Sequence, residues 1–184
     1  MNEHDDLAGF WAAAWGHLTR GVADRRAPAR HPTLATVSLE GWPEARSVVL
    51  RAASWSEAML EVHSDTDTAK MRALRTSPRA ALHVWVPEAR LQIRVAAEVE
   101  ILTGDQTTER WTRVPVASRI SYGTEPVPGT PIAHASDYAT PGAQDRFAVL
   151  CCHIRGMDLL ELGTPHRRAR FTREDGWKGV WVAP

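Results

Sequence analysis

Two arginines at the ends of one short run are the first residues with chemistry to offer. In PEARSVVLRAAS, residues 43–54, Arg46 and Arg51 flank the four residues SVVL. A guanidinium group makes planar, two-pronged hydrogen bonds to phosphate oxygens. Because side chains alternate along a strand, residues five apart cannot both point squarely off one face of a regular strand. The pair is therefore either part of a phosphate clamp or two strand-end charges that reach water.

The segment that follows adds groups that suit an anion. His63 and Ser64 end the next predicted strand, and Thr66, Thr68 and Lys70 open a predicted helix. A helix N-terminus offers free N–H groups and the positive end of the helix dipole. Lysine adds a point charge, and the hydroxyl groups add donors. Together with the arginines, these residues predict a phosphate site.

A glutamine further along the chain suggests what the phosphate belongs to. Gln92 and Arg94 in RLQIRV lie on the same side of a predicted strand. A glutamine amide both donates and accepts hydrogen bonds, as the polar edge of a heterocycle requires. A phosphate and a polar ring edge describe a nucleotide-like cofactor. The chain contains no Cys-x-x-Cys, His-Glu-x-x-His, glycine-rich phosphate loop or Gly-x-Ser-x-Gly motif, so we expect neither a metal site nor a protein nucleophile.

The elements that must position these residues are mostly strands. Apolar side chains at i, i+3, i+4 spacing predict an N-terminal helix within residues 1–24, with Asp5 or Asp6 as its cap. Its apolar face is Leu7, Phe10, Trp11, Ala14, Trp15, Leu18 and Val22. Short helices are predicted at 64–78, capped by Ser64 or Asp65, and at 104–114. Strands are predicted at 32–39, 44–53, 58–63, 79–86, 91–102, 147–154, 157–162, 167–173 and 177–182. An antiparallel barrel with added helices accommodates these elements.

The bulk composition limits the classes of function. The chain has 184 residues, which predicts one domain, and its Lys+Arg and Asp+Glu totals are both 22, which argues against nucleic-acid binding. We expect no membrane span, and the acidic N-terminus lacks a signal-peptide layout, so a cytoplasmic location is expected. Cys151 and Cys152 are adjacent and predicted to be buried thiols on opposite strand faces. The proline-rich residues 114–145 predict a long loop, of a kind that is usually functional or ordered by a partner.

Four segments in order resemble the pyridoxamine 5'-phosphate oxidase family, over a stretch from about Pro32 to Pro184. They are RSVVLR, VHSDTDTAKMRAL, PRAALHVWVPEARLQIRVAAEVEIL, and LGTPHRRARF with the ending WVAP. The resemblance implies a mainly β fold, an antiparallel split β-barrel of Greek-key type with an N-terminal helix and short additional helices. It also implies FMN as cofactor, a homodimer with FMN at the subunit interface, and a small phosphorylated substrate.

The resemblance carries specific residues over to this chain. Those implied to contact FMN are Arg46, Ser47, Val48, Val49, Arg51, His63, Ser64, Lys70, Gln92 and Arg170. Arg170 would reach the cofactor of the partner subunit. Those implied to contact substrate are Arg51, Arg113, Ser118 and Arg167, although Arg167 could equally be a solvated strand-end charge. No side chain is implied as catalytic, since flavin N5 carries the chemistry in this family.

Departures from the family pattern gather in the substrate segments. Arg51 stands where the family has lysine, Arg119 follows Ser118 where the family has glutamine, and Ala169 stands where the family has a second histidine. Three functions follow. The first is FMN-dependent oxidation of pyridoxamine or pyridoxine 5'-phosphate or a related small amine or alcohol. The second is an FMN-binding sensor or carrier, and the third is a split barrel for haem or a deazaflavin. RSVVLR, Lys70 and Gln92 favour FMN over haem.

Overall fold

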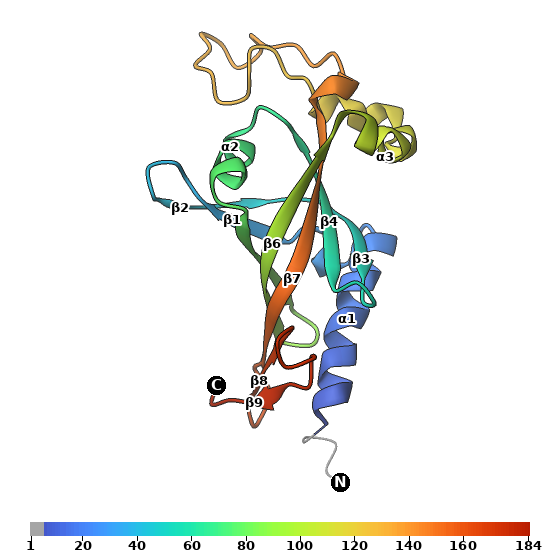
Figure 1. The fold of residues 1–184 in the computed structure, drawn as a ribbon, viewed down its shortest axis with the longest axis vertical. Helices are drawn as coiled ribbons and strands as arrows, with labels where there is room; N and C mark the ends of the chain where they lie inside the picture. Colours follow the sequence, from blue (N-terminus) through green and yellow to red (C-terminus); the bar gives the residue numbers. More distant parts are fainter. Residues whose placement is uncertain (1–5) are drawn as a thin grey trace.

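A computed structural model describes residues 6–184 as one antiparallel sheet of nine strands with helices around it (Figure 1). The helical elements are α1 (Leu7–Ala23), η2 (Pro28–Arg30), α2 (Ala69–Thr76), η3 (Gly104–Thr107), α3 (Thr108–Arg113), η4 (Val116–Ser121) and η5 (Gln144–Arg146). The strands are β1 (Thr33–Val37), β2 (Pro43–Ser47), β3 (Leu50–Ser54), β4 (Met59–Asp65), β5 (Arg79–Val86), β6 (Leu91–Thr103), β7 (Phe147–Glu161), β8 (Arg167–Thr172) and β9 (Val180–Trp181). No helix within the described part of the chain has the length and apolarity to cross a bilayer.

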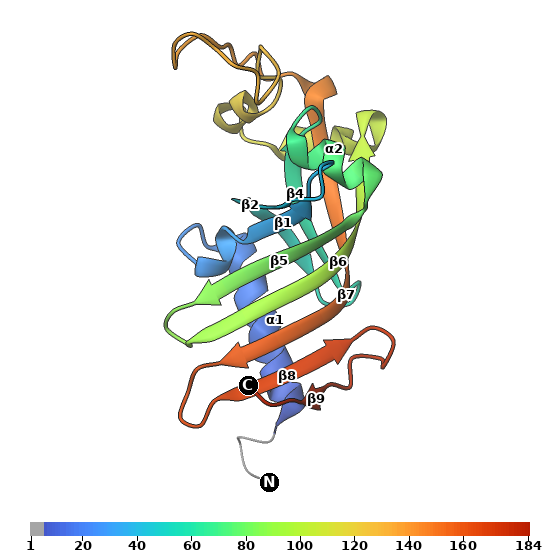
Figure 2. The ribbon, with the colours of Figure 1, turned by 90° about the vertical axis from the view of Figure 1, so that its left-hand side faces the viewer.

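The long strand β7 holds the sheet together. The strand order is β2-β1-β5-β6-β7-β4-β3, with β8 paired to β7 and β9 to β8. β7 lies along β6 for most of its length, while its first half also pairs with β4 and its second half with β8. It changes partner around residues 154–156, opposite a register shift between Ala96 and Ala97 of β6. The sheet therefore opens into two parts that share β6 and β7, and Figure 2 shows the part with β5, β6, β7 and β8 face on.

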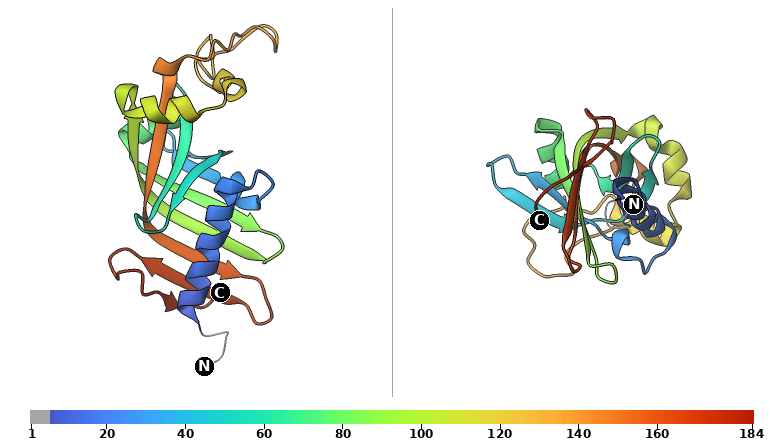
Figure 3. Two further views of the ribbon diagram at one scale, coloured as in Figure 1. Left: turned by 90° about the vertical axis from the view of Figure 1, so that its right-hand side faces the viewer. Right: turned by 90° about the horizontal axis from the view of Figure 1, so that it is seen from below.

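Helix α1 covers the open side of the sheet, as Figure 3 shows. The Asp6 side chain caps it by accepting a hydrogen bond from the Gly9 amide at 2.9 Å, in agreement with one of the two predicted caps. The predicted apolar face is confirmed, because its central residues are buried and its end residues pack on the core. Trp11 stacks on Trp177 and contacts Phe171, so this helix is held to the last strands by aromatic rings.

Two predicted strand assignments are wrong, and both errors concern the point at which the chain changes its pairing partner. Residues 44–53 are two strands rather than one, because β2 pairs with β1 whereas β3 pairs with β4. Val48 and Val49 form the crossing, and the Val48 amide donates to the Pro32 carbonyl at 3.0 Å. Conversely, residues 147–154 and 157–162 are one continuous strand, β7, in which Gly156 lies where the partner changes from β4 to β8.

Three other boundaries differ from the predictions. Thr68 occupies the N-cap position of α2 without a side-chain capping bond. Ser64 and Asp65, the predicted caps, continue β4 and pair with β7. The last predicted strand shrinks to two residues, since Trp177 and Gly179 take positive φ angles of 63° and 76° that interrupt extended backbone. The predicted helix at 104–114 begins as the 3-10 turn η3, and the predicted loop contains the turn η4.

Two apolar clusters lie on opposite sides of β7. The large inner core includes Leu150 and Cys152, and a smaller outer cluster includes Phe147 and Cys151. Trp111 and Tyr122 of the segment after β6 complete the outer cluster and fix that segment over β4 and β7. The two thiols are free, buried and on opposite faces, as the alternation of strand side chains predicts.

Candidate functional site

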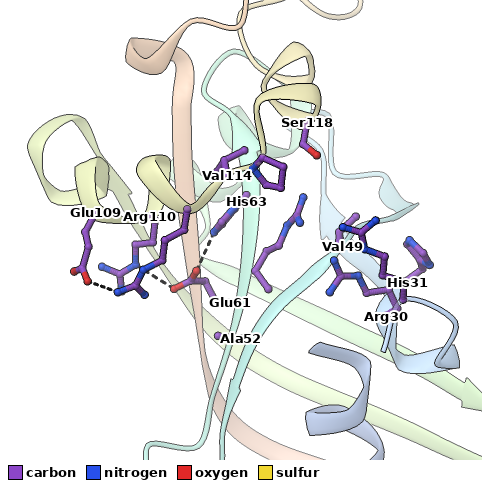
Figure 4. A pocket seen from close by; sticks show the side chains of 14 residues that line it. Arg30, His31, Val49, Ala52, Glu61, His63, Glu109, Arg110, Val114 and Ser118 are labelled. Carbon is purple, nitrogen blue, oxygen red and sulfur yellow. Dashed lines mark hydrogen bonds and ion pairs between the residues drawn. The ribbon is translucent and has the colours of Figure 1, made fainter. Parts of the chain in front are cut away.

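A pocket of about 700 Å³ lies between the outer face of β3 and β4 and the segment that carries α3 and η4. Its size is that of a site for a small molecule or cofactor. The lining residues are Arg25, Arg30, His31, Val49, Arg51, Ala52, Glu61, His63, Glu109, Arg110, Arg113, Val114, Pro115 and Ser118. Of the residues predicted to bind cofactor or substrate, the pocket brings together Val49, Arg51, His63, Arg113 and Ser118 (Figure 4).

Arg51 enters this pocket from an irregular point of its strand. The β3–β4 register shifts between Leu50 and Ala52, which places Arg51 at a bulge, and a bulge re-aims the side chain that it carries. The Nε atom of Arg51 is buried without a hydrogen-bond partner in the described chain. Burial raises the pKa of the nearby Tyr122, and the positive charge of Arg51 opposes that rise. Arg51 is thus a partly buried cation without a carboxylate partner among residues 6–184.

A buried acid, an imidazole and a guanidinium form a network on the wall beside Arg51. Glu61 Oε1 lies 2.9 Å from His63 Nε2, and Glu61 Oε2 accepts from Arg110 Nε at 3.2 Å. The Glu61 and His63 side chains are each 9% exposed. Burial works to raise the pKa of Glu61, but the bonds from His63 and Arg110 outweigh it and lower that pKa. Glu61 therefore stays ionised and fixes both partners.

Arg113 and Ser118 lie on the side of the pocket formed by α3 and η4. Arg113 Nη2 donates to Glu109 one helical turn earlier, and the Arg113 and Glu109 side chains are 73% and 72% exposed. Ser118 follows Pro115 in the turn η4 and is half-buried. The charge of Arg113 is therefore matched by Glu109, in contrast to that of Arg51.

A second group of predicted residues gathers at the start of α2. Lys70 Nζ donates to Thr68 Oγ1 at 3.3 Å, and Thr68 Oγ1 lies 3.2 Å from Ser64 Oγ. Burial lowers the pKa of Lys70, the nearby Arg46 lowers it further, and Asp65 opposes both. Lys70 thus lies near a second cation, Arg46, and its own hydrogen-bond partner is a neutral hydroxyl group.

Arg46 itself is already engaged with its own hairpin. Its Nη1 donates to Thr36 Oγ1 at 2.8 Å and to the Leu34 carbonyl at 3.3 Å, and its Nη2 donates to Glu44 Oε2 at 2.7 Å. These bonds hold the guanidinium in one orientation. They also place a carboxylate beside the predicted phosphate site.

The remaining predicted residues lie elsewhere in the protomer. Ser47 is exposed at the end of β2, and Val48 belongs to the inner core. Gln92 faces His83, whose Nε2 is 3.4 Å from Gln92 Oε1. Arg167 pairs with Glu161 at 2.5 Å, and Arg170 is exposed on β8. Figure 1 shows β8 at the end of the molecule opposite α3, so one protomer does not bring Arg167 and Arg170 to the pocket.

Sequence reasoning missed several residues of the pocket. Arg25, Arg30 and His31 follow α1, where charged residues are ordinary and carried no signal. Glu61 and Arg110 are 49 residues apart, and only the tertiary fold joins them. The alternation of β4 places Glu61 on the same face as His63, and that was the one available signal.

Comparison with known proteins identifies the family. The family described as pyridoxamine 5'-phosphate oxidase, FMN-binding domain, matches residues 12–103. A pyridoxine/pyridoxamine 5'-phosphate oxidase of Xanthomonas axonopodis pv. citri is 34% identical over 156 residues, covering 83% of this chain and 68% of that protein. The chain belongs to the pyridoxamine 5'-phosphate oxidase family. The oxidase of the same name from Xanthomonas campestris is 29% identical over 160 residues, with the same coverage.

Solved structures agree with the split-barrel fold of the family. A pyridoxamine 5'-phosphate oxidase-related, FMN-binding protein from Nostoc punctiforme has a TM-score of 0.75 at 25% identity, over 95% of this chain and 97% of that one. PhzG from Burkholderia lata, in complex with tetrahydrophenazine-1-carboxylic acid, has a TM-score of 0.69 at 19% identity, over 100% and 97%. The second likeness concerns the fold alone. The predicted split barrel is confirmed.

The residues of this family member fit the phosphate of FMN at one place. Lys70 is a partly buried cation beside a second cation, Arg46, and its one side-chain hydrogen bond is to a hydroxyl group. An anion close to both cations would stabilise them, although Arg46 already has Glu44 as a partner. Ser64, Thr68 and the N-terminus of α2 add donors around it. Arg46, Ser64 and Lys70 would therefore hold the phosphate group.

Proposed function

We propose that the protein binds FMN and uses it to oxidise a small phosphorylated amine or alcohol related to pyridoxamine 5'-phosphate. The observation that carries the proposal is the presence of two separate cationic places. One is the pair of Lys70 and Arg46 at the start of α2, and the other is Arg51 in the pocket. A phosphorylated cofactor and a phosphorylated substrate need one place each.

The chain would contribute binding, orientation and fixed charge. FMN supplies a two-electron oxidant when bound. Arg51 would hold the anionic group of the substrate, and its bulged position directs it into the pocket. Glu61 keeps His63 and Arg110 in fixed positions through a network that is largely removed from water. These residues would orient the substrate without forming a covalent bond to it.

The direct test is an absorption spectrum of the purified protein with FMN, repeated without oxygen after addition of pyridoxamine 5'-phosphate. Loss of the flavin band supports the oxidase. A flavin band that stays unchanged with this compound and with pyridoxine 5'-phosphate favours an FMN-binding protein without oxidase activity. A protein that takes up no FMN contradicts the proposal as a whole.

The role of Arg51 has its own test. Because a charge-assisted hydrogen bond contributes about 1.5–3 kcal/mol, Arg51→Met should weaken binding of pyridoxal 5'-phosphate by roughly 10- to 100-fold. Binding of unphosphorylated pyridoxal should change little. Arg173→Met is the matched control, since Arg173 is exposed and lies outside the pocket. Equal affinities for pyridoxal 5'-phosphate in Arg51→Met and wild type would contradict this assignment.

A homodimer with FMN between the subunits is part of the proposal. It is supported by the distance between the two ends of the protomer, because Arg167 and Arg170 lie on β8, away from the pocket. A second copy of the chain could bring them to the site. Co-expression of Arg51→Met with Arg170→Met tests this: mixed dimers should regain one intact site, whereas each variant alone should have none. Light scattering should show a dimer, and a monomer that is fully active would contradict it.

A further inference from the structure

Three arginines from three different elements meet on one wall of the pocket. Arg25 follows helix α1, Arg30 ends the turn η2, and Arg51 comes from the bulge in β3. Figure 4 shows Arg30, His31 and Val49 together on this wall, away from Glu109 and Arg110. We call Arg25, Arg30 and Arg51 the arginine wall.

The charges of the arginine wall repel one another. Burial lowers the pKa of Arg30, and the positive charges of Arg51 and Arg25 lower it further. Among residues 6–184, the ion pairs of the protein include none with Arg25, Arg30 or Arg51. Three positive charges are thus held together without a carboxylate to balance them. Such an arrangement is unfavourable until an anion enters.

Backbone carbonyls hold Arg30, the middle member of the arginine wall, in place. Arg30 Nη1 donates to the Val22 carbonyl at 2.9 Å and to the Leu50 carbonyl at 3.3 Å. One side chain therefore joins the last turn of α1 to the residue before Arg51. The same bonds leave the Nη2 atom of Arg30 without a partner in the described chain. Arg30 is therefore in place before any ligand binds, which lowers the cost of ordering this side chain on binding.

The other charged residues that line the pocket are electrically balanced. Glu61 binds both His63 and Arg110, and Glu109 binds Arg113. The positive charge available to a ligand in this pocket is therefore concentrated on the arginine wall.

We propose that Arg25, Arg30 and Arg51 form the anion subsite of this pocket and take a dianionic phosphate monoester group. This deepens the proposed function, because it names the residues that would hold the substrate phosphate and moves that contact from Arg113 to the arginine wall. Three guanidinium groups match the oxygens of a phosphate and its double charge better than those of one carboxylate.

The ligand-binding test uses inorganic phosphate and pyridoxal 5'-phosphate with the FMN-loaded protein, measured by calorimetry. Arg25→Gln should weaken both by about tenfold or more, because it removes charge-assisted hydrogen bonds. Arg26→Gln is the matched control, since Arg25 and Arg26 are both exposed and only Arg25 lines the pocket. It should leave both affinities within about twofold, the range expected for an exposed charge. Arg113→Gln should have a smaller effect than Arg25→Gln.

A second measurement follows the charge of the bound phosphate by its phosphorus resonance. Free phosphate monoesters take up a proton near pH 6, and the arginine wall should keep the bound group dianionic well below that pH. Arg25→Gln should bring protonation back towards the free value. The other titratable or charged groups that face the pocket are His31, Glu61, His63, Glu109, Arg110, Arg113 and the nearby Tyr122. Glu61→Gln should leave the phosphorus titration closer to wild type than Arg25→Gln does.

The outcomes separate this inference from the proposed function. If phosphate binds and Arg25→Gln lowers its affinity, the proposed anion subsite is supported. This conclusion stands even where no amine or alcohol reduces the flavin. If pyridoxal 5'-phosphate binds equally to wild type, Arg25→Gln and Arg51→Met, the subsite is wrong even in an active oxidase. Failure of both phosphate ligands to bind, or a larger loss with Arg113→Gln, also overturns it.

Discussion

Asp65 Oδ2 accepts a hydrogen bond from the backbone amide of Gly123 at 2.6 Å, although the two residues are 58 positions apart. Its Oδ1 accepts from Arg146 Nη2 at 2.8 Å. The carboxylate thus ties the beginning and the end of the long segment between η4 and β7 to the end of β4. Burial works to raise the pKa of Asp65, but the bonds from Asp67, Gly123 and Arg146 outweigh it and lower that pKa.

Replacing this carboxylate should loosen the segment and the fold together. Because the Asp65 side chain is 3% exposed and Arg146 is its partner, we expect Asp65→Asn to lower the free energy of unfolding by about 2–4 kcal/mol. Asp67→Asn is the control, since Asp67 is 42% exposed and should cost less than about 1 kcal/mol. Urea unfolding and limited proteolysis of residues 123–145 measure the two effects. Equal losses in both variants would contradict the anchoring role.

The same group predicts how stability depends on acid. A carboxyl whose pKa is lowered by folding contributes its full stability above the unfolded pKa, about 3.9 for Asp, and loses it as pH falls through the folded pKa. The stability difference between wild type and Asp65→Asn should therefore be constant near neutral pH and shrink below about pH 4. Urea unfolding between neutral and acidic pH checks the sign, and a difference that grows on acidification would contradict it.

The lowered pKa of Lys70 predicts that FMN binding weakens at alkaline pH. Its pKa is lowered by burial and then by Arg46, so the ammonium group loses its proton below the usual lysine value of about 10.4. We expect FMN affinity to fall as pH rises through that lowered pKa, because the neutral amine no longer attracts phosphate. Lys70→Arg should remove the alkaline fall, and Lys70→Met should weaken binding at every pH. FMN fluorescence titrations measure this; an identical alkaline fall in Lys70→Arg would contradict it.

We expect that removal of the ion pair between Glu44 and Arg46 raises the affinity for FMN. The Glu44 carboxylate holds Arg46 at 2.7 Å and is 38% exposed. If Arg46 meets the FMN phosphate, Glu44 competes with it, and Glu44→Gln should tighten FMN binding by roughly 2- to 5-fold, since exposed pairs contribute at most about 1 kcal/mol. Glu40→Gln, at an exposed position in the adjoining turn, should have no effect. Weaker binding in Glu44→Gln would show that this acid orients Arg46 instead.

The aromatic contacts that attach α1 to the sheet predict that Trp11 contributes far more than Trp42 to the free energy of unfolding. Trp11 is 6% exposed and contacts Phe171 and Trp177, so Trp11→Ala should cost about 3–5 kcal/mol of unfolding free energy. Trp42 is 73% exposed at the tip of the β1–β2 hairpin, and Trp42→Ala should change stability by less than about 0.5 kcal/mol. Chemical denaturation compares them. A large loss with Trp42→Ala would indicate that a second subunit covers it.

Features set by neighbours in sequence were predictable. The periodic apolar face of α1 and the alternation of Cys151 and Cys152 across a strand follow from local spacing alone. The break at Val48 was not, because SVVL has the composition of a continuous strand. The break is set by pairing, because residues before Val48 pair with β1 and residues after Val49 pair with β4.

The same limit applies to the site. Residue type and order point to Arg51 and His63, and the fold brings both to one pocket, while their roles stay predictions. Arg25 and Arg30 carried no local signal, because a pocket-lining charge after a helix looks like any solvated charge. Their proximity to Arg51 depends on how α1 lies on the sheet.

The adjacent cysteines allow two kinds of opening, local and global, to be followed by thiol reactivity. Cys152 belongs to the inner core, and burial raises its pKa to about 12, whereas Cys151 faces the outer cluster with a less buried thiol, whose pKa is also raised by burial. A thiol reacts with an alkylating agent only when it is reached and ionised. Alkylation of Cys151 would then time the lifting of the α3 segment, and alkylation of Cys152 the opening of the whole barrel. A ligand that closes the pocket would slow alkylation of Cys151. The alkylation rate of Cys152 would still depend on the global free energy of unfolding.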